Sequence, residues 1–80
     1  MKVYILNVTD NLNTNLFVYE NSALANKGMR EKVEQEVLNA GGLANQGLTI
    51  ILEENHAVVE NECTGFNTTY SICSFDVISQ

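Results

Sequence analysis

The only histidine of the chain lies among glutamates in the stretch TIILEENHAVVENE, residues 49–62. Side chains of these types act as general acids and bases or as metal ligands. A catalytic base must lie close to the proton it removes, be oriented by a third group and stand in a pocket that excludes water. His56 beside Glu53 and Glu54 falls at the tip of a predicted hairpin, which offers little of this. We therefore expect an exposed histidine near a turn, with no catalytic role and no bound metal.

Two cysteines, Cys63 and Cys73, are the other candidates for chemistry. Their spacing matches neither the CxxC nor the histidine-paired pattern of a metal site. As a nucleophile Cys63 would need His56 as its base, but we expect these two residues at opposite ends of one strand. In a reducing cytosol we expect two free thiols, one or both of them buried, with a disulfide as the alternative.

Motifs for phosphate binding or hydrolysis, such as GxxxxGK[ST], HExxH and GxSxG, do not occur in the chain. We therefore predict a protein that is not an enzyme and that needs no cofactor. A small hydrolase acting through His56 and its neighbouring glutamates is the least favoured alternative.

The composition is acidic and globular. Ten carboxylates against four Lys and Arg give a formal charge of -6. This charge disfavours nucleic acid as a direct ligand and steers the chain towards basic proteins, which include proteins that bind DNA or RNA. With 45% hydrophobic and 18% charged residues, the 80-residue chain is predicted to fold as a single domain over residues 1–80.

The predicted hairpin at residues 48–62 has one apolar face and one mixed face. Period-two alternation places Leu48, Ile50 and Leu52 together on the apolar face. If Glu54 and Asn55 form a two-residue turn, Ile50 opposes Val59, and a four-residue loop would keep the same faces. A mixed face suits protein binding, because apolar residues supply burial and charges supply steering, although a solvated face is the alternative. The predicted partner-binding residues are Glu53, Glu54, Glu60, Glu62, Ile51 and Val58.

One helix of about 18 residues is predicted from Ser22 to Ala40, with Asn21 or Ser22 as its cap and Gly41-Gly42 as its end. Gly28 costs about 1 kcal/mol there relative to alanine, but its missing side chain would let the helix approach the sheet closely. Every fourth position is apolar and lines one side of the helix: Ala25, Met29, Val33 and Val37. Ion pairs are expected on the solvated side: Lys27 with Glu31, Arg30 with Glu34 and Lys32 with Glu36.

Strands are predicted on both sides of these elements. DNLNTN separates the β-rich runs VYILNV and LFVYE, which predict a first hairpin, and YSICSFDVI at residues 70–78 alternates as a last strand. The order β-β-α-β-β-β predicts an α+β fold, with an antiparallel sheet of four to five strands and one helix packed across it. We expect the core between the apolar side of the helix and the Leu48, Ile50 and Leu52 row.

Apolar runs are too short for export or membrane insertion. The run in MKVYILNVTD is about five residues long, below the roughly 7 to 15 of a signal-peptide core. No stretch approaches the roughly 20 apolar residues of a membrane span. The expected location is the cytoplasm, without a membrane partner.

The layout of the chain resembles that of small phage and mobile-element proteins of the anti-CRISPR type. The resemblance rests on MKVYILNVTD, a short second strand, a helix that begins near SALA, an acidic hairpin and the terminal YSICSFDVI. It is one of pattern, and no functional residue carries over, because anti-CRISPR proteins share no active-site motif. The resemblance implies a non-enzymatic inhibitor in the host cytoplasm that binds a basic CRISPR effector and blocks its nucleic-acid site. The alternative is a self-associating structural or regulatory phage protein, a homodimer with Ile51 and Val58 at its interface.

Overall fold

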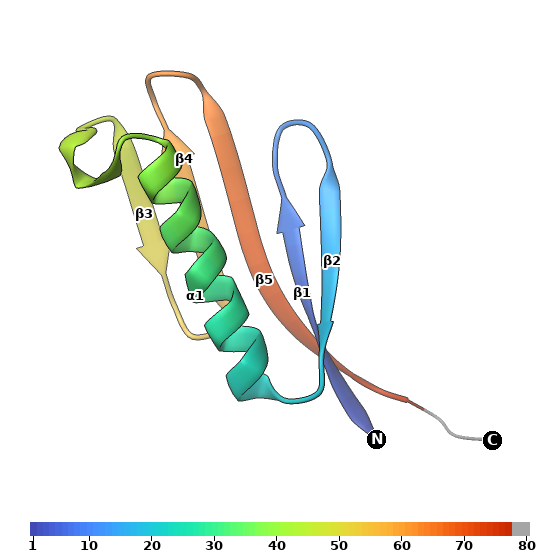
Figure 1. The fold of residues 1–80 in the computed structure, drawn as a ribbon. Helices are drawn as coiled ribbons and strands as arrows, with labels where there is room; N and C mark the ends of the chain where they lie inside the picture. The colour runs from blue at the N-terminus through green and yellow to red at the C-terminus, as the bar shows by residue number, and fades with distance from the viewer. Residues whose placement is uncertain (78–80) are drawn as a thin grey trace.

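The computed structural model describes residues 1–77 as one five-stranded antiparallel sheet with an α-helix across one face (Figure 1). The strand order is β2-β1-β5-β4-β3. This arrangement confirms the predicted α+β class and the β-β-α-β-β-β order. The elements are β1 (Lys2–Thr9), β2 (Thr14–Tyr19), α1 (Ser22–Asn39), a 3-10 turn (Gly42–Ala44), β3 (Leu48–Leu52), β4 (His56–Asn61) and β5 (Phe66–Asp76). Within this part of the chain, no helix combines the length and the apolarity needed to cross a membrane.

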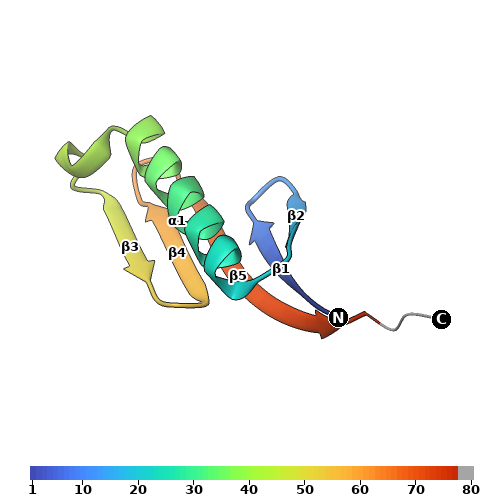
Figure 2. The same ribbon diagram turned by 60° about the horizontal axis from the view of Figure 1, so that its bottom comes forward.

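The longest strand, β5, joins the two hairpins into one sheet. Its residues 69–76 pair with β1, and its residues 66–71 pair with β4 (Figure 2). It begins at Phe66, earlier than the predicted Tyr70, because the polar residues before Tyr70 also take ladder positions, with Thr68 buried. Ile78, which the sequence also places in this strand, lies outside the described residues.

Asparagine and aspartate side chains close the loops at one end of the sheet. Asp10 Oδ1 accepts bonds from the backbone N–H groups of Leu12 and Asn13, at 2.8 and 2.9 Å, which stabilises the β1–β2 turn. Asn11 donates to the carbonyl of Gly65 and accepts from the N–H of Asn67. The turn between β1 and β2 is therefore bonded to the loop between β4 and β5.

The helix begins and ends as its sequence predicts. The Asn21 side chain accepts a bond from the Leu24 N–H at 2.8 Å, which satisfies one of the unpaired donors of the first turn. At the other end Gly41 has a φ of 103°, a left-handed conformation that glycine adopts without strain. The predicted length of about 18 residues is confirmed.

The core lies between α1 and the middle strands of the sheet. Ala25, Met29 and Val33 of the predicted helix stripe are buried, and Val37 is half-buried. The sheet contributes buried side chains from β1, β4 and β5: Leu6, Ala57, Val59 and Tyr70.

The predicted contribution of the Leu48, Ile50 and Leu52 row to the core is largely wrong. Leu48 packs against the core, but Ile50 and Leu52 keep 38% and 43% of their surface exposed. These residues do face the helix side of the sheet, but β3 is an edge strand and α1 lies over its neighbours (Figures 1 and 2). An α-helix is about 10 Å wide and strands are about 4.8 Å apart, so one helix covers about two strands.

Two of the three predicted ion pairs along α1 are replaced by other contacts. Lys27 Nζ lies 4.0 Å from Glu31 Oε1, as expected. Arg30 instead donates to Asn26 Oδ1 at 2.9 Å. Lys32 Nζ lies 3.9 Å from the centre of the Phe17 ring on β2, a cation–π contact, while its expected partner Glu36 turns towards β5.

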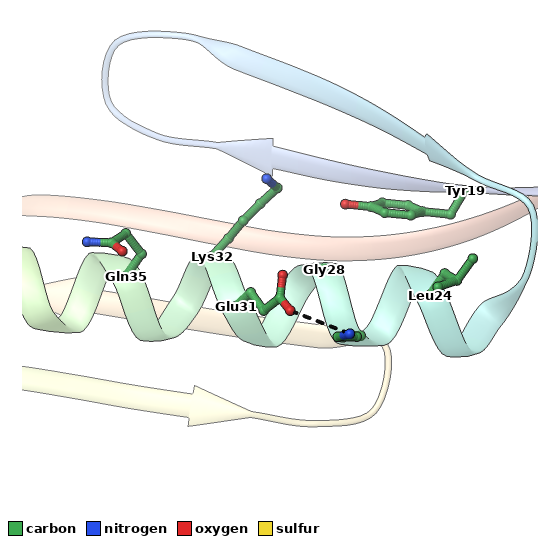
Figure 3. A pocket seen from close by; sticks show the side chains of 7 residues that line it. Tyr19, Leu24, Gly28, Glu31, Lys32 and Gln35 are labelled. Atoms are coloured by element: carbon green, nitrogen blue, oxygen red, sulfur yellow. Dashed lines mark ion pairs between the residues drawn. The ribbon is translucent and has the colours of Figure 1, made fainter.

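Gly28 allows the close approach of helix and sheet that its position predicts. The Tyr19 side chain of β2 reaches over the helix at this residue (Figure 3). A Cβ atom at position 28 would lie 2.7 Å from the Cζ atom of Tyr19, which is closer than such contacts allow. The glycine therefore makes room for a ring that links β2 to the helix layer.

We predict that Gly28→Ala destabilises the fold by about 1 kcal/mol. Alanine in a helix interior normally gains about 1 kcal/mol over glycine, but overpacking costs roughly 1–3 kcal/mol, and the clash with Tyr19 should outweigh the gain. Urea denaturation of both proteins measures the difference in free energy of unfolding. In a Tyr19→Ala background the same substitution should stabilise instead. An equal gain in both backgrounds would show that the contact does not constrain the helix.

Candidate functional site

The β3–β4 hairpin has the register of the two-residue turn, one of the two alternatives that the sequence left open, and its tip is bonded to other elements. Ile50 lies opposite Val59, and the Glu53 N–H donates to the His56 carbonyl at 2.7 Å, so Glu54 and Asn55 form the two-residue turn. Both turn residues are also bonded to other elements. The Asn26 side chain of α1 donates to the Glu54 carbonyl, and the Ile72 N–H of β5 donates to the Asn55 carbonyl at 2.9 Å.

The two apolar residues among the predicted partner-binding residues, Ile51 and Val58, lie together on the sheet face that α1 does not cover. Ile51 and Val58 are direct cross-strand partners, and they point away from the face that holds Leu48. Ile51 keeps 46% of its surface exposed and Val58 is half-buried. The hairpin therefore presents an apolar contact point at the middle of its outer face.

The four predicted glutamates are exposed but do not form one cluster. Glu60 lies within β4 on the same face as Val58, opposite Thr49. Glu53 and Glu54 lie at the turn, and Glu62 follows β4, with its N–H bonded to the Gly47 carbonyl at 2.9 Å. His56, the cross-strand neighbour of Glu53, is four residues from Glu60, or about 13 Å along an extended strand. Negative charge thus stands at both ends of the hairpin with the apolar pair between.

His56 and Cys63 lie at opposite ends of β4, as the sequence predicts, and are too far apart to contact each other. His56 is half-buried, so the expectation of an exposed histidine is wrong: its place at the first position of β4, opposite Ser71, covers part of the ring. Cys63 follows the far end of that strand, about 20 Å away at the rise of an extended chain. Over residues 1–77, no three side chains of His, Cys, Asp or Glu gather closely enough to hold a metal ion.

Both cysteines are free thiols, and the expectation that at least one is buried is wrong. Cys63 lies in the loop after β4, where its thiol is 3.8 Å from Asn45 Oδ1. Cys73 lies in β5 next to Ile72, on the uncovered face of the sheet. Half of the side chains of a strand point to such a face, so a central strand can still expose a cysteine.

A polar contact under α1 was not expected from the sequence. Thr68 Oγ1 of β5 donates to Glu36 Oε1 at 2.5 Å, and Tyr70 is buried two residues further along the strand. The other carboxylate oxygen of Glu36 is buried without a hydrogen-bond partner among the described residues. Glu36 follows Val33 by three positions and so lies beside the buried stripe, which is the signal in the sequence that could have predicted it.

The Tyr70 phenol is held in its neutral form. Burial raises its pKa well above the ordinary value, and the nearby charge of Glu36 raises it further, because both disfavour the phenolate. A smaller contribution comes from Asp10. The contact between Glu36 and β5 thus bonds the helix to the sheet, and the Tyr70 phenol beside it stays protonated.

Grooves run along both flanks of α1. On the side of β3, an apolar groove of about 510 Å³ lies between Val33, Val37 and Leu38 of the helix and Ile50 and Leu52 of the sheet. On the side of β2, a groove of about 470 Å³ is lined by Tyr19, Leu24 and Gly28 and by the polar side chains of Lys27, Glu31, Lys32 and Gln35 (Figure 3).

Comparisons of the chain with protein-family models, curated proteins and solved structures gave no match. From its fold and its surface, the chain is a small acidic α+β protein whose β3–β4 hairpin exposes both apolar and acidic side chains.

We predict that the stability of the chain falls as pH rises above about 10 and that Tyr70→Phe removes this fall. The unfolded chain loses the phenolic proton near pH 10, whereas the folded chain keeps it, so deprotonation favours unfolding by about 1.4 kcal/mol at about pH 11. Urea denaturation of both proteins at about pH 8 and about pH 11 measures the effect. An equal loss of stability in the two proteins would contradict the prediction.

Proposed function

We propose that this chain is a non-enzymatic inhibitor of the anti-CRISPR type. It binds a basic, nucleic-acid-handling effector protein in the host cytoplasm and occupies the site that nucleic acid would use. The observation that carries the proposal is the Ile51–Val58 pair on the uncovered sheet face, with exposed glutamates at both ends of its hairpin.

Charge supports a basic partner. The chain has a formal charge of -6, and Glu53, Glu54, Glu60 and Glu62 present carboxylates at the two ends of one surface. A nucleic-acid site is lined by Lys and Arg that normally bind phosphates, so carboxylates are attracted to the same groups. Steering of this kind raises the association rate and selects the site on the partner.

Apolar contact should contribute more to the free energy of binding than charge does. Exposed ion pairs contribute about 0–1 kcal/mol each, whereas burial of an apolar side chain contributes about 1.5–3 kcal/mol. Ile51 and Val58 are held side by side by the β3–β4 ladder, and the hairpin tip is bonded to α1 and β5. A pre-organised surface loses little entropy on binding, which favours affinity.

The distance between His56 and Cys63 also supports binding rather than catalysis. His56 and Cys63 lie beyond contact at the two ends of β4, and His56 faces Ser71 across the ladder. The glutamates of the hairpin are exposed to water, where general acid–base chemistry gains little.

We predict that reversing the charges of Glu53, Glu60 and Glu62 to lysine abolishes tight binding. Each substitution adds two charges, so the net charge changes from -6 to zero. Exposed substitutions alter stability by less than about 0.5 kcal/mol each, so the fold should remain. Affinity should fall at least about tenfold, or about 1.4 kcal/mol. The measurement is titration against a panel of purified CRISPR effectors, with DNA cleavage as a second readout.

A matched control reverses Glu20, Glu31 and Glu34, which are exposed and do not belong to the outer face of the hairpin, because Glu20 precedes α1 and the other two lie on it. Glu36 is left unchanged because it accepts the bond from Thr68. The control has the same net charge and should lose less than about threefold in affinity if the hairpin is the site. Equal losses in both variants would assign the effect to overall charge. If no effector in the panel is bound or inhibited, the proposed function is wrong.

We further predict that His56→Ala keeps inhibition within about threefold of the original chain. His56 is half-buried beside Val58 and Glu53, but it belongs neither to the apolar pair nor to the carboxylates that carry the proposal, so its loss should change the free energy of binding by less than about 0.7 kcal/mol, or threefold. Inhibition of effector cleavage is measured at equal concentrations of the two proteins. Loss of nearly all inhibition, with unchanged binding, would indicate an enzymatic mechanism through His56.

A further inference from the structure

The uncovered face of the sheet carries an apolar patch away from the acidic hairpin. Its side chains come from three neighbouring strands, β2, β1 and β5. Ile5 lies between its cross-strand partners Val18 and Cys73, and Val3 lies opposite Phe75. The patch consists of Val3, Ile5, Leu16, Val18, Cys73 and Phe75, all of them half-buried or exposed.

The patch is separated from the negative charges of the chain. On the uncovered face, the one carboxylate within a strand of residues 1–77 is Glu60, whose partner on β5 is Asn67. Asn67 is six residues from Cys73, or about 20 Å along β5. Glu53, at the turn of the hairpin, lies two strand spacings from Ser71 and so about 12 Å from Cys73. The remaining carboxylates of the chain belong to α1, the helix side of β5, or the other turns and loops. Electrostatic attraction therefore does not direct a basic partner to this patch.

We propose that the uncovered face binds the same face of a second copy of this chain. Two acidic chains repel each other wherever their carboxylates meet, and repulsion is lowest where neither carries them. A two-fold interface places the same patch on both partners, so the patch need only complement itself. An uncharged apolar patch on a chain of charge -6 meets this condition.

The size of the patch fits a weak dimer. Three strands about 4.8 Å apart and about 20 Å of strand length give about 300 Å² in projection for each partner, and the side chains that project from the sheet add to this. An interface of this size belongs to the small class that is typical of weak complexes, so the dimer should form only as the concentration rises. Two sheets would pack about 10 Å apart, with the apolar patches at the centre and a helix layer on each outer side.

The one-sided core gives a reason for this association. The buried apolar side chains of the sheet, such as Leu6 and Val59, all face α1. A second sheet would bury the other face of β1 and β5 as well. This proposal does not depend on the inhibitor function, because it is centred on β2, β1 and β5 and not on Ile51 and Val58.

The two cysteines provide an internal test. Cys73 lies within the patch and Cys63 lies in the loop after β4, and both are exposed in the single chain. Sedimentation equilibrium should show twice the mass of one chain as concentration rises. Over the same range, the rate at which a maleimide labels Cys73 in a Cys63→Ser variant should fall in proportion to the remaining monomer. Cys63 in a Cys73→Ser variant should be labelled at a constant rate.

A matched pair of substitutions locates the interface. Leu16 lies in the patch and Leu38 lies on α1, and each keeps 61% of its surface exposed. Leu16→Lys should raise the dissociation constant of the dimer at least about tenfold, because it places a cation in an apolar contact. Leu38→Lys should leave it unchanged. Both substitutions lower the net negative charge equally, so general repulsion cannot explain a difference.

Three outcomes would overturn the proposal. The first is a mass that stays that of one chain at every concentration. The second is equal labelling kinetics for Cys63 and Cys73 while the mass doubles. The third is dissociation by Leu38→Lys and not by Leu16→Lys, which would place the interface in the groove between α1 and β3.

Discussion

The width of a single helix is the constraint on which the rest of the structure depends. A helix about 10 Å wide covers about two strands, yet the sheet has five. The buried core is therefore limited to the middle strands, where Leu6, Val59 and Tyr70 meet Met29 and Val33. The edge strands and the whole second face of the sheet keep apolar side chains in contact with water, and these are the surfaces available for partners.

Two contacts hold that one helix in place over the sheet. Near its start, the absence of a side chain at Gly28 admits the Tyr19 ring from β2. Near its end, Glu36 accepts a bond from Thr68 of β5 and lies beside the buried Tyr70. The first contact depends on shape and the second on charge and hydrogen bonding. Together they set the position of α1 along the sheet, and so which apolar residues remain exposed.

The exposed surfaces differ in the partner that they suit. On the β3–β4 hairpin, Ile51 and Val58 stand between glutamates, a combination suited to a basic protein surface. Around Ile5 and Cys73 the same sheet face lacks charge, which suits an identical surface. A dimer centred on the second surface would carry two acidic hairpins, and a partner with two basic sites would then be bound with higher avidity.

Local signals in the sequence determined the elements, and tertiary packing decided their environments. Asn21, the four-residue spacing from Ala25 to Val37 and Gly41 determined the helix, because caps and periodicity act within a few residues. Alternation likewise determined the shared face of Ile51 and Val58, whereas the register that pairs Ile50 with Val59 depended on the length of the turn, which alternation leaves open. It did not determine that β3 is an edge strand, that Cys73 is exposed or that Glu36 bonds to Thr68. Those outcomes depend on strand order and on where the helix lies, and both are set by contacts between residues far apart in the chain.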